Sequence, residues 1–465
     1  MANSESKAKK SPVGDFFRAL GSDCREIGTT WAEGDGKTKL SFLIFGIGPI
    51  LRGRALVGAL HLALEILLIA FIAGFGWQYF SKLLTLGTVE TNASGRVTTY
   101  GDNSFLILLF GLLTLCALAA LIFVWRMNVR ENRTEELLLK DGKKLPDNHT
   151  DFLSLFDSHF DVTLLALPVL GVFVFTVLPI IFMICVAFTN YDATHQAPSK
   201  LFTWVGLKNF RDLFSFGQDG FGSTFLTVLA WTLVWAFFAT FLCYFLGIAV
   251  AMLINKKGIR FKKLWRTILV MTIAVPQFVS LLYVGKLFAP DGLINGTLLK
   301  WGLIRSALPF WTNPMWARIT IIVVNIWIGI PYMMLIATGL LMNIPEDLYE
   351  SARIDGATPW QMFRSITLPY MLFVTGPFLL TQFTGNLNNF NVIFLLNQGN
   401  PKSMGMVGGA GGTDLLVTWL YKMTINDTNY KMAAVIGIMV FIVTAVISLV
   451  VYQMLPSVKD EEGFQ

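Results

Sequence analysis

Long runs of apolar residues recur along this chain and dominate its pattern. A run of about 20 apolar residues is long enough to cross a hydrocarbon core of about 30 Å as a helix. Leu40–Leu51 is too short to cross and contains two glycines and a proline, so we expect it to be interfacial or re-entrant. Eight runs are long enough to cross, at about 57–80, 104–126, 162–188, 224–254, 266–289, 317–341, 370–396 and 432–455.

The composition agrees with this all-α integral membrane fold of about eight transmembrane helices. Hydrophobic residues make up 54% of the 465 residues and charged residues 14%, well below the share of about 25% that is usual in soluble domains. The first long apolar run begins only near residue 40, behind a polar arm. We therefore expect no cleavable signal peptide, and the first span itself should direct insertion.

The basic residues predict the orientation of these spans in the membrane. An even number of spans puts both termini on the same side of the membrane. If that side is the cytoplasm, most of the 36 Lys and Arg residues are cytoplasmic, as is usual in membrane proteins. The basic residues flank spans and form no extended patch. The net charge of +6 therefore predicts contact with anionic lipid headgroups and not with nucleic acid. The clearest cytoplasmic marker is the loop that holds Lys256, Lys257, Arg260, Lys262 and Lys263.

The order of spans and polar stretches divides the chain into parts. Residues 1–39 form a cytoplasmic N-terminal arm. Residues 40–160 hold the short interfacial run, two spans and a basic linker. Residues 161–456 hold six spans, and residues 457–465 form a cytoplasmic tail.

Between the sixth and seventh spans lies a cytoplasmic segment, Pro345–Pro369, with the sequence PEDLYESARIDGATPWQMFRSITLP. A proline is well placed to start a helix, and Glu346 and Asp347 put negative charge at the positive end of the helix dipole. Gly356 allows a sharp turn, and Pro359 or Pro369 limits continuation of the helix. The segment is predicted to form two short helices with a bend between them.

The spacing of Glu350, Ser351, Ala352 and Gly356 with the later Ile-x-Leu-Pro resembles the "EAA" coupling motif of permease subunits in bacterial ABC importers, with Ser351 where the family usually has Ala. Other stretches resemble sugar-importer permeases of the maltose/maltodextrin type, including their relatives for other oligosaccharides. These stretches are Phe188–Tyr191, Val205–Phe210, Asn325–Tyr332, Asn386–Phe390 and GGTDLLVTWLYKM. The resemblance covers roughly residues 160–455.

This resemblance implies a type I ABC importer permease core of six helices, preceded by two extra N-terminal helices. It implies a bacterial cell-membrane location and four kinds of partner: a second permease subunit, a dimeric ATP-binding subunit, an extracellular sugar-binding protein and an oligosaccharide. ATP hydrolysis would then belong to the ATP-binding subunit and not to this chain. The residues implied in ATPase coupling are Glu350, Ser351, Ala352, Asp355, Gly356, Ile366, Leu368 and Pro369.

Amide side chains recur in the late spans, where polar residues are costly and often functional. Asn325, with Gly329 and Tyr332, falls at i, i+4 and i+7 on one helix face, and Asn386 and Asn389 share another face. Amides and an aromatic ring suit a neutral ligand rich in hydroxyl groups. The alternative for each amide is a hydrogen bond between packed helices.

Gln277 follows Pro276, where a helix break would free backbone carbonyl groups toward a cavity. The resemblance adds Gln277 and eight others as the residues that line the sugar site. Three of them depart from the family pattern, because Ile273 replaces a Tyr, Gln277 a Ser and Gly385 a Phe, so the sugar should differ from maltose in length or linkage. The nine residues are Ile273, Gln277, Asn325, Ile328, Gly329, Tyr332, Gly385, Asn386 and Asn389.

The alternative function is a secondary sugar transporter driven by an ion gradient. Such a protein should show internal repeats and carboxylates near the middle of the membrane. We find no convincing repeat, and Glu65 is the one clear intramembrane carboxylate. Glu65 and His61 lie four residues apart in the first span and could pair with each other or face a neighbouring helix. A structural role of this kind is a simpler interpretation than a proton relay.

Catalytic and cofactor chemistry has little support in the sequence. The cysteines form no CxxC pair and no Cys/His cluster, so we expect neither a metal site nor a disulfide. Gly36-Lys37-Thr38 lacks the glycine that a phosphate-binding loop requires five residues earlier, where Trp31 stands. We therefore predict a translocation subunit without a cofactor.

Overall fold

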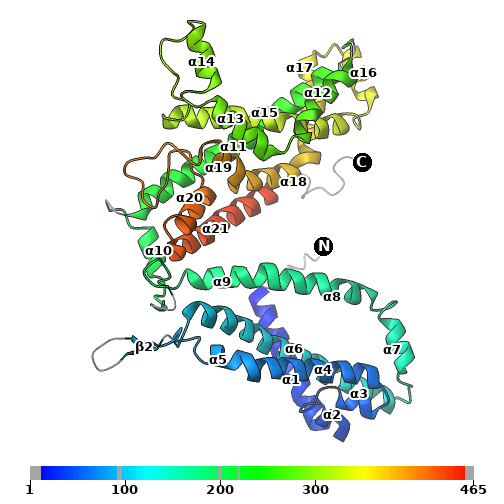
Figure 1. Cartoon of the computed structure of the whole chain (residues 1–465). Coiled ribbons are helices and arrows are strands. Elements are labelled where there is room, and N and C mark those ends of the chain that lie inside the picture. The colour runs from blue at the N-terminus through cyan, green and yellow to red at the C-terminus, as the bar shows by residue number, and fades with distance from the viewer. Residues whose placement is uncertain are drawn as a thin grey trace, which may run out of the picture. The chain divides into compact units, whose positions relative to one another are not determined.

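The computed structural model describes residues 12–91, 97–99, 101–196, 200–217, 220–256 and 258–455. The first eleven residues of the expected N-terminal arm, the expected tail at 457–465 and Lys257 lie outside these residues. The described part is helical apart from a hairpin of two short strands (Figure 1). It divides into two compact units, Met1–Cys185 with His195–Trp204, and Val186–Thr194 with Val205–Gln465.

The helices of the described residues confirm most of the expected spans. Seven helices are long and apolar enough to cross a membrane, and a bent pair of helices would make an eighth span. The third expected span groups with the N-terminal unit. The sequence places this span at the start of a core that runs from residue 161, and that division stays a prediction.

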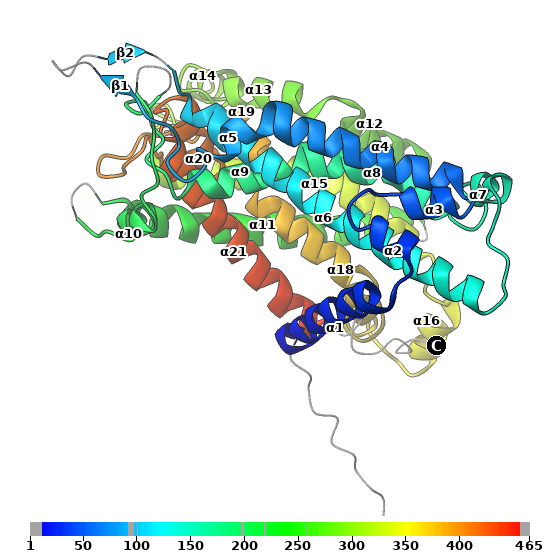
Figure 2. The same ribbon diagram turned by 90° about the horizontal axis from the view of Figure 1, so that it is seen from below.

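The N-terminal unit is built around the long helix α6. Its elements are α1 (Pro12–Glu33), α2 (Gly36–Leu40), α3 (Ile47–Leu51), α4 (Ala55–Phe71), a π-helical turn (Ile72–Gly76), α5 (Trp77–Phe80), β1 (Glu90–Thr91), β2 (Val97–Thr99), α6 (Ser104–Lys140), α7 (Asn148–Ser154), α8 (Phe160–Val172), a second π-helical turn (Phe173–Val177) and α9 (Leu178–Val186). Helices α4 and α5 pack against α6 (Figure 2). Strands β1 and β2 pair antiparallel.

Side-chain hydrogen bonds hold the short run Leu40–Leu51 in place within this unit. The Glu65 carboxylate on α4 accepts the backbone N–H of Phe45 at 2.8 Å, and Asn128 on α6 accepts the N–H of Gly46 at 2.9 Å. The ring of His61 contacts the Val57 carbonyl and Glu131 of α6. Of the two expectations for His61 and Glu65, the pair between them is absent and the contact with a neighbouring helix is present, because His61 faces Glu131 of α6 and Glu65 accepts from Phe45.

An ionic cluster joins α3, α4, α6 and α7 at one end of the unit. Arg54 donates to Asp151 on α7 at 2.8 and 2.9 Å and to Glu135 on α6 at 2.6 Å. Both carboxylates are buried, at 6% and 3% exposure of their side chains. The hydrogen bond to Asp151 raises the pKa of Arg54 above its ordinary value. Arg52 extends the cluster to Asp35 and Asn132.

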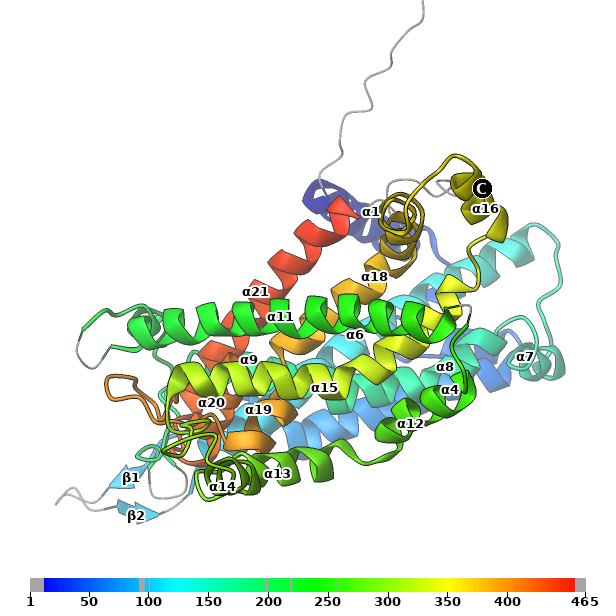
Figure 3. The same ribbon diagram turned by 90° about the horizontal axis from the view of Figure 1, so that it is seen from above.

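The C-terminal unit holds the remaining spans. Its helices are α10 (Lys208–Leu213), α11 (Phe221–Asn255), α12 (Lys262–Ala274), α13 (Gln277–Leu287), α14 (Leu293–Lys300), α15 (Pro314–Leu341), α16 (Glu346–Ile354), α17 (Pro359–Met362), a π-helical turn (Phe363–Thr367), α18 (Leu368–Leu387), α19 (Phe390–Asn397), α20 (Leu416–Ile425) and α21 (Tyr430–Met454). Helices α11 and α15 lie side by side (Figure 3). Gly247 permits their close approach, since a Cβ there would lie 2.5 Å from the Cβ of Met333.

The fifth expected span, 266–289, is broken in two. Helices α12 and α13 meet at an angle of 92°. Val275 is extended, as a residue before proline should be, and Pro276 has no N–H to continue the helical ladder. The expected break beside Gln277 is therefore confirmed.

The glycine-rich loop between α19 and α20 is ordered by a buried acid. The carboxylate of Asp414 accepts the N–H of Gly411 and pairs with Lys422 on α20 at 2.6 Å. Burial raises the pKa of Asp414 above its ordinary value, although the ion pair with Lys422 opposes this shift. The carbonyl of neighbouring Thr413 accepts the indole N–H of Trp231, which ties the loop to α11.

The ionic cluster predicts a large loss of stability on Arg54→Met. The substitution leaves Asp151 buried without its cation and leaves Glu135 with only the longer contact to Arg52 at 3.5 Å, which should cost about 3 kcal/mol of unfolding free energy. Thermal unfolding of the purified chain in detergent measures the loss. Arg130→Met is the control, because Arg130 pairs with Asp23 and Glu26 at an exposed position and should contribute less than about 1 kcal/mol. Equal unfolding midpoints for the two variants would contradict this account.

Candidate functional site

Four helices of the C-terminal unit and the segment before α19 bring polar side chains to one cavity of about 170 Å³. Helix α11 supplies one wall, α15 and α18 supply two more, and Gln277 stands at the start of α13 after the break in the fifth span. The cavity is lined by Ala239, Thr240, Cys243, Gln277, Asn325, Ile328, Gly329, Tyr332, Met333, Leu379, Gln382, Asn386 and Asn389.

Seven of the nine residues expected from the sequence line this cavity. Ile273 lies instead in an adjoining cavity of about 500 Å³, which shares Gln277, Ile328, Gly329 and Tyr332 with the first and adds Trp327 and Ser280. Gly385 lines neither cavity, and a Cβ at this position would meet no atom within 4 Å. The grouping of these residues follows from the fold, while their role toward a sugar stays a prediction.

The cavity amides are held by neighbouring groups. Asn386 donates its side-chain N–H to Thr240 Oγ1 at 3.0 Å, and its backbone carbonyl accepts the indole N–H of Trp235. Asn389 donates to the side-chain carbonyl of Asn386 at 3.2 Å. Asn325 donates to the thiol sulfur of Cys243 at 3.6 Å. These three asparagines therefore have fixed orientations, as ligand-binding groups on a rigid scaffold should.

Helix α11 is the part of the site that the sequence did not indicate. Thr240 and Cys243 lie three residues apart on one face of this helix and both line the cavity. The 35-residue helix is mostly apolar and its several threonines do not mark a single face, so its sequence gives no sign of which face meets the cavity. Gln382 is different, because it lies one turn before Asn386 on α18 and helical spacing alone could have found it.

The cavity suits a neutral polar ligand. Its lining combines amides, a hydroxyl group and the ring of Tyr332, and it contains no Asp, Glu, Lys or Arg. Within the described residues there is no group of three or more His, Cys, Asp or Glu side chains placed to hold a metal. The arrangement can bind and orient a hydroxyl-rich molecule but offers no acid–base pair or nucleophile for a reaction on it.

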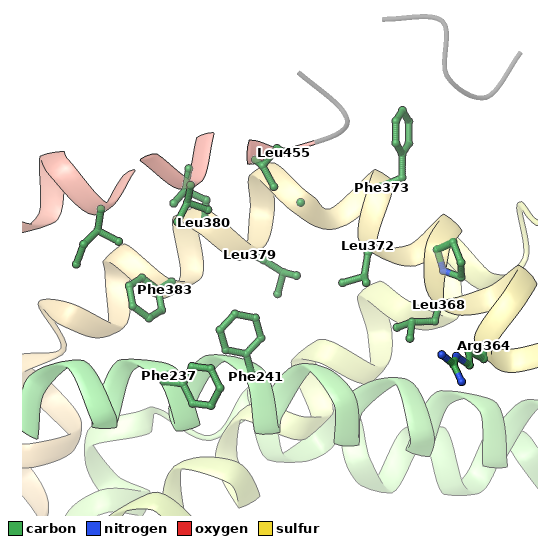
Figure 4. A pocket seen from close by; sticks show the side chains of 14 residues that line it. Phe237, Phe241, Arg364, Leu368, Leu372, Phe373, Leu379, Leu380, Phe383 and Leu455 are labelled. Carbon is green, nitrogen blue, oxygen red and sulfur yellow. The ribbon is translucent and has the colours of Figure 1, made fainter. Parts of the chain in front are cut away.

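A larger cavity of about 890 Å³ lies between α11, α18 and α21 (Figure 4). Phe237 and Phe241 of α11 face Leu379 and Leu372 of α18 across it. Arg364 is the one charged residue in its lining. A sugar would find few hydrogen-bond partners there, so volume alone does not identify the binding site.

The segment 345–369 has the expected form of two short helices with a bend. Helix α16 begins after Pro345 with Glu346 and Asp347 in its first turn. Gly356 adopts a left-handed conformation at φ +77°, and the N–H of Ala357 bonds back to the carbonyl of Ala352 at 2.9 Å. Thr358 then opens α17 with a capping box.

The residues implied in coupling fall into two groups within this segment. Glu350, Ser351, Asp355 and Gly356 are exposed, and Ala352 is half-buried. Of the later residues, Ile366 belongs to the π-helical turn that leads into α18, and Leu368 and Pro369 are the first residues of α18.

One hydrogen bond that the sequence did not indicate joins the two parts of the segment. The hydroxyl of Tyr349 on α16 lies 2.8 Å from that of Thr367, just before α18. Thr367 is buried. This contact fixes α16 to the start of α18.

Large apolar side chains are exposed on the same segment. Ile354 is 86% exposed and Trp360 68%, while Leu348 is half-exposed. Exposed apolar residues beside exposed acids are typical of a protein-binding surface. The segment therefore has the surface of a docking element.

Known proteins of similar sequence identify the family. Residues 243–459 match the family model described as "Binding-protein-dependent transport system inner membrane component". The galactooligosaccharides transport system permease protein GanP of Bacillus subtilis is 35% identical over 421 residues, which cover 90% of this chain and 97% of that protein. The maltodextrin transport system permease protein MalC of Streptococcus pneumoniae is 33% identical over 437 residues, which cover 92% of this chain and 97% of that protein.

A solved structure is similar in fold. It is a bacterial ABC transporter involved in the import of the acidic polysaccharide alginate, with a TM-score of 0.53 and 25% identity over 65% of this chain and 97% of the other. Together with the two relatives above, this match shows that the chain is a multi-pass inner-membrane protein of the family of binding-protein-dependent transport system inner membrane components.

Proposed function

We propose that this chain is the permease subunit of an ATP-driven importer of maltodextrin or a related oligosaccharide. The observation that carries the proposal is the cavity in which Asn325, Asn386 and Asn389 meet Gln277 and Tyr332. Its uncharged polar lining matches the hydroxyl groups of a sugar. The names of the two relatives, which are permeases for galactooligosaccharides and maltodextrin, support the same class of substrate.

The energy for transport would enter through the segment 345–369. This segment joins α15, which carries Asn325 and Tyr332, to α18, which carries Asn386. A push on α16 by a closing ATPase would reach α18 through the Tyr349–Thr367 hydrogen bond. Both walls of the cavity would then move, which would open the sugar site alternately outward and inward.

The proposed complex contains a second permease subunit, a dimeric ATP-binding subunit and an extracellular sugar-binding protein. The family description names dependence on a binding protein, which supports the last of these. Hydrolysis of ATP would take place on the ATP-binding subunit. In the bacterial cell membrane both termini of this chain would be cytoplasmic, so that the segment 345–369 faces the ATPase.

The sugar would differ from maltose because the site lacks two aromatic side chains. Gly385 leaves open space beside Asn386, and Ile273 places an aliphatic side chain in the adjoining cavity. A longer or differently linked oligosaccharide would have room there. Aromatic side chains at positions 385 and 273 would fill part of this space and restrict the length or linkage of the sugar that fits.

An ion-driven sugar transporter is the alternative, and the contacts of Glu65 speak against it. Glu65 accepts the N–H of Phe45 within the N-terminal unit, which is a structural role. The polar cavity of the C-terminal unit is lined by no carboxylate that could carry a proton or bind a cation. Uptake by the reconstituted complex should therefore require ATP and should be insensitive to a proton ionophore.

Glu350→Lys should uncouple ATP hydrolysis from transport. The Glu350 side chain is exposed, so a substitution that reverses its charge should not unfold α16, and the protein should reach the membrane at the wild-type level. Sugar-stimulated ATP hydrolysis and uptake in proteoliposomes should both fall by at least about tenfold, as expected for loss of a charged contact at an interface. Asp141→Lys, a reversal at another exposed acid, is the control and should change neither. Normal coupling in Glu350→Lys would contradict the proposed docking role.

Gly385→Phe should shift the sugar preference toward maltose. A Cβ at this position would meet no atom within 4 Å, so a side chain has open space at its base and we expect the variant to fold. The new ring should raise maltose uptake relative to maltotriose by about threefold to tenfold. Gly339→Phe is the control, since Gly339 also has open space but lies on α15 about two turns beyond Tyr332, whereas Gly385 adjoins Asn386 of the cavity lining. An unchanged preference in Gly385→Phe would remove position 385 from the sugar site.

A further inference from the structure

Thr240 of α11 is the least expected member of the polar cavity. It is 3% exposed and stands among apolar neighbours in the middle of a membrane-spanning helix. Its Oγ1 accepts the side-chain N–H of Asn386 at 3.0 Å. This hydrogen bond links α11 to α18.

The direction of the hydrogen bonds in this cluster is set from the backbone. The N–H of Val392, in the first turn of α19, can only donate, and it bonds the side-chain carbonyl of Asn389 at 3.2 Å. Asn389 must therefore turn its amino group to the carbonyl of Asn386 at 3.2 Å. Asn386 in turn directs its own amino group at Thr240. If Asn386 were reversed, two amino groups would face each other without an acceptor.

The series ends on the hydroxyl of Thr240, which is left with a proton to donate. Within the described part of the chain this hydroxyl has no acceptor, although its residue lines the cavity. A buried hydroxyl without an acceptor loses a hydrogen bond that a ligand can restore. Hydrogen bonds that run in one direction also polarise each other, which makes the last donor stronger.

Asn325 of α15 has the opposite character. The amino group of Asn325 donates to the sulfur of Cys243, whose thiol lies 3.8 Å from the backbone carbonyl of Asn325. The side-chain carbonyl of Asn325 therefore remains as an acceptor. The cavity offers one directed donor and one directed acceptor, and a sugar hydroxyl can serve both.

We propose that Thr240 is a sugar-binding residue that also positions Asn386. In the bound state its hydroxyl donates to an oxygen atom of one sugar ring, at the end of the series Val392, Asn389, Asn386 and Thr240. This inference rests on the proposed function, because it assigns one more group to the proposed sugar site. It extends the site to α11, which supplies none of the nine residues expected from the sequence.

The test compares Thr240→Val and Thr240→Ser in the purified complex of this chain with its partner subunits. Valine keeps the shape of threonine and removes the hydroxyl, while serine keeps the hydroxyl. The probes are radiolabelled maltose, maltotriose and galactobiose, together with analogues of the best-bound sugar that each lack one hydroxyl. Thr227→Val is the matched control, since Thr227 lies on α11 but outside the polar cavity.

Thr240→Val should bind the best sugar about threefold to tenfold more weakly, as expected for loss of one neutral hydrogen bond. Wild type should bind one of the deoxy analogues more weakly than the parent sugar by a similar factor. Thr240→Val should bind this analogue and the parent sugar equally, because the variant cannot form the Thr240–sugar hydrogen bond with either of them. Thr240→Ser should retain the discrimination, and Thr227→Val should match wild type.

Two other results would overturn the inference and are distinguishable from failure of the proposed function. Unchanged affinity in Thr240→Val would remove the residue from the site. Equal weakening of every analogue, with discrimination retained, would assign Thr240 a packing role only. Failure of the wild-type complex to bind or import any of the three sugars would instead overturn the proposed function itself.

Discussion

A polar group inside the membrane must find its hydrogen-bond partner within the protein or in a ligand, because hydrocarbon offers none. This constraint accounts for the arrangement of the late spans. Asn386 and Asn389 satisfy each other, and Thr240 and the N–H of Val392 complete the series. The groups that are left over point to a cavity and not to lipid. The donors and acceptors of the cavity that lack a partner in the protein are therefore the groups to which we propose a sugar binds.

The cavity and the proposed docking segment are connected along the chain and by hydrogen bonds. Amides held by neighbouring helices cannot move alone, so the site changes only when α15 or α18 moves as a unit. The segment 345–369 joins those two helices, and the Tyr349–Thr367 hydrogen bond makes α16 part of the start of α18. A rigid link between docking surface and cavity is what transport driven by a partner ATPase requires.

The sequence predicted those features that depend on local chemistry. Apolar length gave the spans, Pro276 gave the break in the fifth span, and helical spacing gave the amide faces of α15 and α18. It could not predict Thr240, because the threonines of the mostly apolar helix α11 do not reveal which face meets a cavity. It could not predict that His61 contacts Glu131 and the Val57 carbonyl, because that choice depends on the packing of α4 against α6. The sequence also could not predict that Ile273 of α12 lines the adjoining cavity, because its position depends on the bend between α12 and α13.

The central claim is that sugar crosses the membrane through the cavity between α11, α15 and α18 of this chain. A structure of the assembled transporter with bound maltotriose tests it most directly. The account predicts sugar density within hydrogen-bond distance of Asn325, Asn386 and Thr240. Density in the apolar cavity beside Phe237 and Phe241, with the amide-lined cavity empty, would contradict it.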